Sequence, residues 1–247
     1  MNKKISIICP THRRKELQTR FAKNVYDNCS NSDLCEIVFG IDNNDEIALE
    51  TYDNLRNQYG EHFIRAVLIN PGENIPNISN ICFPHCRGQI IGNAADDVVF
   101  RSKDWDQTVI NEFSKYPDKI LLLWSDDGLW GGSLASHYFL HENWIKTTGH
   151  VQPTFFHADW TDHWNQKLAN NLGRGVLIRD RSKLFLEHLH AEFNGMEKDE
   201  TYWKMKERRE KNVAEGLSFH KPTPEMKAAH ELEYLKLKKF IEEFKNE

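Results

Sequence analysis

Apolar runs alternate with amphipathic stretches through the first hundred residues. Residues 4–9, 36–41 and 63–69 are rich in branched and aromatic side chains, which is typical of buried strands. Residues 15–29 carry an apolar side chain at every fourth position, which predicts a helix, and a second helix is expected over residues 46–58. Strands that alternate with helices at this spacing predict a mostly parallel sheet covered on both faces.

The second half of the chain has a less regular pattern. Residues 119–124 predict another buried strand, residues 162–172 a helix and residues 175–178 an extended segment. Apolar and polar side chains alternate with a period of two toward His188 and His190. A strand there would place both histidines on the same face.

The end of the chain predicts a packed helix. Thr223 and Pro224 form an N-cap and a first-turn proline, and an apolar stripe follows at Leu237, Phe240, Ile241 and Phe244. No internal repeat or convincing linker interrupts the sequence. We therefore expect an α/β fold with one domain over residues 1–205 and a C-terminal helical tail, residues 206–247, packed on it.

Composition narrows the class of protein. The 247 residues are 39% hydrophobic with a net charge of −5, which excludes a disordered chain and argues against a nucleic-acid coat protein. No apolar run is long enough to span a bilayer, and the first apolar stretch is too brief for a signal peptide. The five cysteines are irregularly spaced and indicate free thiols, so a cytoplasmic location is expected.

Polar residues follow two of the predicted strands and a further apolar segment at residues 89–92. They lie at residues 11–14, 42–45 and 96–97, and they include arginines and several carboxylates. The carboxyl ends of parallel strands meet at one edge of a sheet, so these loops should converge on one crevice. Carboxylates beside arginines that can reach phosphates form a natural site for a divalent cation bridging a diphosphate.

Several segments together resemble a known family. In chain order, ISIICPTHRR, EIVFGIDNND and GQIIGNAADDVVFRSKDWD resemble nucleotide-sugar glycosyltransferases of the GT-A fold, particularly the inverting family 2. The similarity continues through DDGLWGGSLASHYFL, FFHADWTDHW and LEHLHAEFNGMEKDETY, so that it covers roughly residues 4–202. It implies a Rossmann-like GT-A domain that transfers a sugar from a nucleoside-diphosphate sugar, most often a UDP-sugar, to a hydroxyl group.

The resemblance assigns the donor-binding residues. Pro10, Thr11 and Arg14 would line the nucleotide pocket, and Asp42 would hydrogen-bond the base. Asp96 would lie near the ribose or the sugar.

The resemblance also implies a metal site. Asp97 matches the last acid of the family's Asp-any-Asp motif and would bind Mn²⁺ or Mg²⁺, while Ala95 stands where many relatives carry another acid. The histidine that completes the site would be His188 or His190, and the sequence does not choose between them.

The general base is expected at Asp159. Relatives often have Glu-Asp at this point, and here Ala158 replaces the first acid. A base at Asp159 would deprotonate the acceptor hydroxyl, which attacks the anomeric carbon in line with the departing diphosphate. Asp162 is the alternative base. Asp127, His137 and Trp160 are expected on the acceptor side.

Other functions stay open at this stage. Nucleotidyl transfer would use a similar crevice, but it usually shows a glycine-rich phosphate loop, and CPTHRRKE contains no glycine. Ala95 and Ala158 keep open a nucleotide-sugar-binding module without catalysis. The acceptor would be a glycan, a lipid-linked glycan or, as in phage-type DNA modification, a hydroxymethylated base. The sugar, the nucleotide and the oligomeric state are undetermined.

Overall fold

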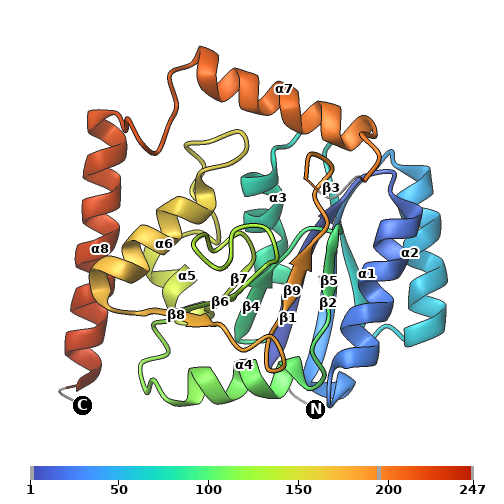
Figure 1. Cartoon of the computed structure of the whole chain (residues 1–247), viewed down its shortest axis with the longest axis horizontal. Helices are drawn as coiled ribbons and strands as arrows, with labels where there is room; N and C mark the ends of the chain where they lie inside the picture. The colour runs from blue at the N-terminus through green and yellow to red at the C-terminus, as the bar shows by residue number, and fades with distance from the viewer. Residues whose placement is uncertain (1–2, 194–195, 246–247) are drawn as a thin grey trace.

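A seven-stranded sheet forms the centre of the computed structural model, which describes residues 3–193 and 196–245 (Figure 1). The strand order is β3-β2-β1-β4-β7-β6-β8. The strands are β1 (Ile5–Thr11), β2 (Cys35–Asp42), β3 (Ile64–Ile69), β4 (Ile90–Asn93), β6 (Leu122–Ser125), β7 (Tyr138–His141) and β8 (Gly175–Ile178). Only β7 runs antiparallel to its neighbours, β4 and β6, and the other pairs are parallel. The expected mostly parallel sheet is confirmed.

Two hydrophobic cores lie on the two faces of this sheet. In β1, Ile5, Ile7 and Cys9 pack into one core and Ile8 into the other, as strand alternation requires. The first core is covered by α1 (Lys15–Asn28), α2 (Glu46–Tyr59) and α4 (Trp105–Ser114). The second is covered by α3 (Ile75–Cys82), α5 (Glu142–Thr148), α6 (Thr161–Leu172) and α8 (Pro224–Lys245). Two short 3₁₀ turns, η1 (Ser32–Leu34) and η2 (Phe83–His85), complete the connections.

A separate two-stranded ribbon brings distant residues together. β5 (Val98–Phe100) pairs antiparallel with β9 (Leu186–His188), with Val98 opposite His188. Asp97 immediately precedes β5, so this register sets the Asp97 and His188 side chains at the same end of the ribbon. The strand expected from residue 184 to 190 is shorter than predicted, and His190 lies just beyond it.

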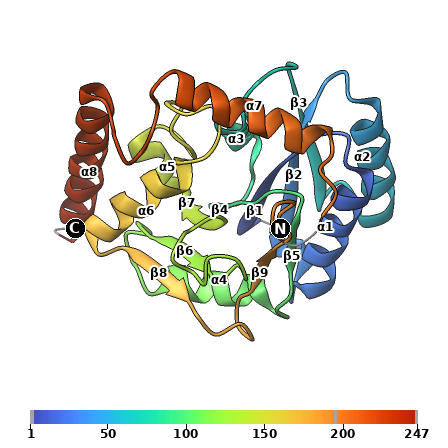
Figure 2. The ribbon, with the colours of Figure 1, turned by 45° about the horizontal axis from the view of Figure 1, so that its top comes forward.

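Helix α7 (Glu200–Ala214) crosses the edge of the sheet where the parallel strands end (Figures 1 and 2). The domain boundary predicted after residue 205 falls inside this helix, so the helix continues across it. The tail helix α8 buries Leu237 and Ile241, whereas Phe244 at the end of its stripe is 40% exposed. Thr223 caps α8 by accepting from the backbone N–H of Met226 at 3.2 Å.

The sequence pattern did not predict several elements, among them α4, α5 and β7. β7 lies in a histidine- and tryptophan-rich stretch without period-two alternation, because all four of its residues are buried. α7 begins at Glu200 and includes the charge-rich stretch over residues 204–211, whose composition indicates a solvated helix face. Within the described ranges, every helix is too short or too polar to cross a membrane.

Candidate active site

A cleft of about 850 Å³ opens at the carboxyl ends of β1, β2 and β4, beneath α7. The predicted donor-side residues all line it: Pro10, Thr11, Arg14, Asp42, Asp96 and Asp97. The predicted residues from the second half that also line it are His137, Asp159, Trp160, Asp162, His188 and His190. The convergence of strand-end loops inferred from the sequence therefore exists in the fold.

Arg14 links the strand ends to α7. Its Nη1 donates to Oδ1 of Asp96 at 3.0 Å, and its Nε and Nη2 donate to the two carboxylate oxygens of Asp199 at 2.6 and 2.8 Å. Thr11 donates its hydroxyl to the other oxygen of Asp96 at 2.8 Å. Burial, reinforced by the neighbouring Asp97 carboxylate, raises the pKa of Asp96 to about 6 against the opposing charge of Arg14.

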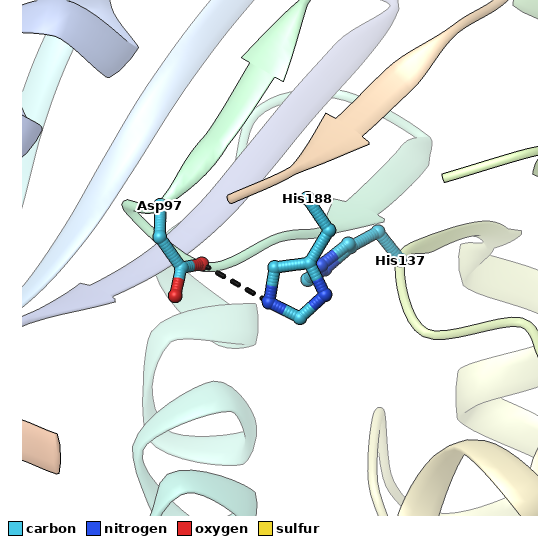
Figure 3. A group of neighbouring side chains, drawn as sticks. All are labelled: Asp97, His137 and His188. Carbon is cyan, nitrogen blue, oxygen red and sulfur yellow. Dashed lines mark ion pairs between the residues drawn. The ribbon is translucent and has the colours of Figure 1, made fainter. Parts of the chain in front are cut away.

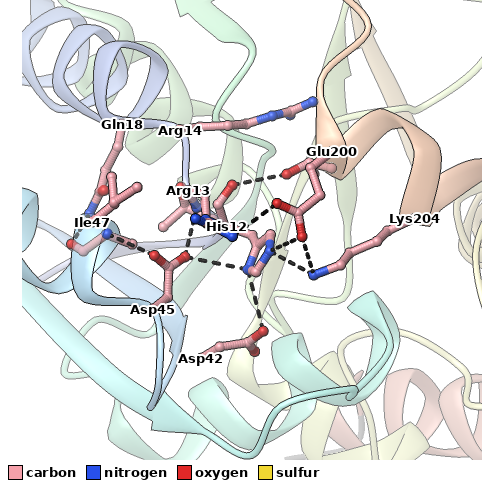
Figure 4. A network of polar contacts seen from close by, with 12 residues as sticks. His12, Arg13, Arg14, Gln18, Asp42, Asp45, Ile47, Glu200 and Lys204 are labelled. Atoms are coloured by element: carbon pink, nitrogen blue, oxygen red, sulfur yellow. Dashed lines mark hydrogen bonds and ion pairs between the residues drawn. The ribbon is translucent and has the colours of Figure 1, made fainter.

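A polar network joins the loop after β1 to the first turn of α7 (Figure 4). Nδ1 of His12 lies 3.4 Å from Oδ2 of Asp42 and 3.3 Å from Oδ2 of Asp45. On its other side, Nε2 of His12 accepts from Lys204 Nζ at 2.7 Å, and Lys204 pairs with Glu200 at 3.1 Å. Asp45 also caps α2 through the N–H of Ala48. The network holds Asp42 beside α7 at the edge of the cleft.

Asp97, His137 and His188 form a group whose ligand atoms all lie within 4.8 Å of one another (Figure 3). Nε2 of His188 is 3.5 Å from Oδ1 of Asp97, and the His137 and His188 rings are 4.6 Å apart. His190 stacks edge-on against His188 at 5.2 Å and is not a member of the group. His137, expected on the acceptor side, therefore lies with the predicted metal ligands.

This group has the chemistry of a cation site. Burial alone would raise the pKa of Asp97, but His188, His137 and Arg14 outweigh it and hold that pKa at about 2. Burial, together with the charge of His188, lowers the pKa of His137 to about 3, so its imidazole is neutral at pH 7. Among the described residues, none hydrogen-bonds the buried Nε2 of His137. An ionised carboxylate beside a neutral, unpartnered imidazole fits a divalent metal.

Asp159 lies on a strained turn that packs against α7. Asp159 and Trp160 both have positive φ, at 44° and 64°. Nε of Arg209 contacts Oδ2 of Asp159 at 2.9 Å. The neighbouring protein partly desolvates the carboxylate and raises its pKa, and the Arg209 charge opposes this rise. Asp162, the alternative base, instead binds the ring of the adjacent His163 at 2.9 Å.

The backbone before Asp159 is fixed by one buried side chain. Asn212 of α7 is 1% exposed; its Nδ2 donates to the carbonyl of Ala158 at 2.6 Å, and its Oδ1 accepts from the N–H of His157 at 2.8 Å. Trp160 packs edge-on against His163 and His220. Helix α7 therefore contacts both the donor-side loop and the turn that carries Asp159.

Asp127 is the predicted site residue that the cleft lining does not include. It is buried, and its Oδ1 accepts from the backbone N–H groups of Leu129 and Trp130 at 3.0 and 2.8 Å. Its carbonyl accepts from the N–H of His188 at 2.9 Å. Asp127 thus shapes a loop and anchors β9, while its carboxylate is satisfied internally.

The sequence reasoning missed several residues that complete the cleft. His12 stood inside the quoted CPTHRR segment, which could have drawn attention to it. The others lie on α7, in a charge-rich stretch whose composition indicates a solvated helix face: Lys204, Arg209 and Asn212. No local pattern marks their contacts in the cleft, because the groups contacted there, on His12, Asp159 and Ala158, are 50 or more residues away.

Comparisons with known proteins identify the fold. No family model and no curated protein matches the chain by sequence. Among solved structures, TarS of S. aureus matches with a TM-score of 0.59 and 11% identity over 74% of this chain. The mannosyltransferase PcManGT of Pyrobaculum calidifontis, solved with GDP-Man and Mn²⁺, has a TM-score of 0.59 and 13% identity over 99% of this chain.

Lengths differ among these structures. The match spans 36% of the TarS chain and 74% of the PcManGT chain. A shorter TarS form, residues 1–349 in complex with UDP-GlcNAc, matches over 64% of its length with a TM-score of 0.58. The chain has the GT-A-type α/β fold of these proteins, as the sequence resemblance implied.

The same fold also hosts a different activity. A protein named as a putative glucose-1-phosphate thymidylyltransferase from Bacillus anthracis matches over 71% of this chain and 86% of its own, with 9% identity and a TM-score of 0.50. The fold alone thus does not separate sugar transfer from nucleotidyl transfer, and the distinction rests on the side chains of the cleft.

Proposed function

We propose that this chain is a glycosyltransferase that uses a nucleoside-diphosphate sugar, a divalent cation and a carboxylate base to transfer a sugar, with inversion, to a hydroxyl acceptor. One observation carries the proposal. On a GT-A-type fold, the Asp97–His137–His188 group lies in the same cleft as the Arg14–Asp96 pair and Asp159. That combination supplies a cation site, a donor-binding edge and a base.

The donor would bind along the ends of β1 and β2. Thr11 and Arg14 fix Asp96 at this edge, where it can accept from ribose or sugar hydroxyls. Asp42, held near His12 under α7, would accept from the base. The donors in the neighbouring structures, UDP-GlcNAc and GDP-Man, support a nucleoside diphosphate of either base, with UDP the expected one.

Asp97, His137 and His188 would hold Mn²⁺ or Mg²⁺, and the Mn²⁺ in the PcManGT structure supports this choice. The bound cation would supply Lewis-acid stabilisation of the diphosphate leaving group. Asp97 meets the need for an anionic ligand at neutral pH because its pKa is held at about 2.

The proton of the acceptor hydroxyl would pass to Asp159. A raised pKa makes this carboxylate a stronger base than an ordinary aspartate, and Arg209 keeps it oriented at 2.9 Å. The hydroxyl oxygen then forms the new bond to the anomeric carbon while the bond to the diphosphate breaks on the opposite side. Arg14, Lys204 and Arg208, which also line the cleft, provide positive charge for the departing diphosphate.

The products distinguish this activity from its rivals. The purified chain would be incubated with UDP-glucose, UDP-GlcNAc or GDP-mannose and Mn²⁺, with and without a mixture of glycan acceptors. We expect release of UDP or GDP from at least one donor, loss of release with EDTA, and an inverted anomeric centre by NMR.

Other results would contradict the proposal. Release of pyrophosphate from a nucleoside triphosphate and a sugar phosphate would indicate nucleotidyl transfer. Nucleotide binding without turnover, equally strong in Asp97→Ala, would indicate a binding module.

A further inference from the structure

Two large aromatic side chains lie exposed at the rim of the cleft. Trp130, in the loop between β6 and β7, is 45% exposed, and Phe193, beyond β9, is 59% exposed. Their ring centroids are 5.8 Å apart at an interplanar angle of 75°, and both residues line the cleft. Exposed aromatic side chains that touch one another at the rim of a cleft are typical of a ligand-binding surface. We call this pair the aromatic platform.

The loop that carries Trp130 is internally braced. The Asp127 carboxylate accepts from the N–H of Trp130 with one oxygen and from the hydroxyl of Ser136, at 2.9 Å, with the other. Gly131 and Gly132 follow with φ of 57° and 78°, values that other residues rarely adopt. The loop thus fixes the backbone of a tryptophan that it leaves facing solvent, so little backbone entropy is left to lose when a ligand binds.

The platform borders the candidate metal group. The ring centroids of Phe193 and His190 are 5.2 Å apart, and those of His190 and His188 are also 5.2 Å apart. The His188 and His137 centroids are 4.6 Å apart. This series of ring contacts runs from the solvent-exposed rim to the buried end of the group. A molecule stacked on the platform would therefore lie beside the place proposed for the diphosphate.

The platform also borders the proposed base. Glu192, next to Phe193, has its Oε1 4.0 Å from Nη1 of Arg209, and Arg209 binds Asp159. Asp159 is 39% exposed and lines the same cleft as Trp130 and Phe193, so an acceptor hydroxyl can reach it from the rim. The platform thus occupies the approach that an acceptor would use.

Charge selects among acceptors. Arg209 is engaged by Asp159 and Glu192, and Arg181, near the same loop, is engaged by Asp126 at 2.8 Å. These carboxylates offset the charge of both arginines, which weakens the attraction of this side of the cleft for a nucleic-acid backbone. A neutral sugar ring fits better, since its C–H face can pack on indole and phenyl rings while its hydroxyl groups donate to Asp159 and Glu192.

We infer that Trp130 and Phe193 form an acceptor subsite for a neutral sugar ring. The inference rests on the proposed function for the reaction that the acceptor undergoes, and it adds that the acceptor is a carbohydrate.

Binding of carbohydrate probes tests the subsite directly. Cellotetraose, maltotetraose, mannotetraose and chitotetraose would each be mixed with the full chain and followed by saturation-transfer NMR. We expect at least one to bind, and Trp130→Ala or Phe193→Ala to weaken it by about tenfold or more. Trp130→Phe should restore part of the binding. Trp203→Ala is the matched control, because Trp203 is 49% exposed on α7 but lies outside the cleft lining, and it should bind as the wild type does.

Several outcomes would overturn the inference, wild-type behaviour of the platform variants among them, and three more are distinct. They are binding of none of the four probes, equal loss in Trp203→Ala and Trp130→Ala, and salt-sensitive binding of a single-stranded DNA containing hydroxymethylcytosine that Trp130→Ala abolishes. Binding of UDP or GDP with Mn²⁺ is measured on the same variants. If that binding and donor turnover persist while the platform variants behave as wild type, the subsite is wrong and the proposed function stands. If donor turnover is absent throughout, the proposed function fails on its own.

Discussion

The two sides of the cleft are built in different ways. On the donor side, Thr11, Arg14 and Asp96 come from strand ends or the residues next to them, and their charged groups are buried and hydrogen-bonded to one another. On the acceptor side, Asp159 and Trp130 come from long loops and keep substantial exposure. The sheet therefore positions the donor side, which α7 only supports through its contacts with Arg14 and His12, whereas α7 and loop contacts alone fix the acceptor side. A mutation on the donor side should change donor binding, whereas a mutation on the acceptor side should change transfer and leave donor binding unchanged.

The largest effect is expected from the proposed base. Asp159→Asn removes the proton acceptor while keeping the shape of the side chain, so transfer should fall by about 10³-fold, and nucleotide affinity should not change. The comparison is made by measuring kcat for transfer and the Kd for UDP or GDP in parallel. Asp162→Asn is the control and should retain transfer, because Asp162 binds His163. Equal losses in the two variants would contradict the assignment.

The donor side should respond through stability as well as binding. Arg14→Met leaves Asp96 and Asp199 without their buried partner, and the free energy of unfolding should fall by about 3 kcal/mol. Urea unfolding at pH 7 measures this change. Arg13→Met, in the same loop but with an exposed ion pair to Glu200, should cost less than about 1 kcal/mol. Similar losses of unfolding free energy in both variants would show that Arg14 stabilises the fold no more than an exposed arginine does.

A smaller effect is expected behind the base. Asn212→Asp keeps the side-chain oxygen that accepts from the N–H of His157. It replaces Nδ2, which donates to the carbonyl of Ala158, with a second oxygen that repels this carbonyl. The turn at Asp159 should therefore be displaced. Transfer should fall by about tenfold with nucleotide affinity unchanged. Glu215→Gln, which alters exposed contacts to the His157 ring and to Lys211, is the matched control. A parallel loss of nucleotide binding would mean that α7 acts on both sides through this residue.

The smallest expected effect is a shift in the pH dependence of transfer. Transfer requires ionised Asp159, so its rate should fall on the acid side of the pH profile as that carboxylate is protonated. Arg209 lowers the pKa of Asp159, and Arg209→Met should therefore move the acid limb of kcat/KM to higher pH. An acid limb that stays in place or moves to lower pH would show that Arg209 does not lower the pKa of the catalytic base.

The same contrast explains what the sequence could predict. Strand periodicity and polar strand ends were enough to bring Thr11, Arg14, Asp96 and Asp97 into one crevice, since a parallel sheet aligns its carboxyl ends. The contacts of Arg209 and Asn212 depend on how α7 folds back over the cleft, and no spacing in the sequence encodes that. His137 was placed with the acceptor because nothing local marks its approach to His188. The choice between His188 and His190 needed the β5–β9 register.

Binding of Mn²⁺ tests the central claim most directly, because it does not require the sugar or the acceptor to be known. Free Mn²⁺ would be followed by electron paramagnetic resonance as the chain is added with UDP or GDP, for the wild type, Asp97→Asn and an exposed-residue control, Asp180→Asn. The account predicts nucleotide-dependent Mn²⁺ binding to the wild type and the control, weakened by about tenfold or more in Asp97→Asn. Absence of Mn²⁺ binding in the wild type, or unchanged binding in Asp97→Asn, would contradict it.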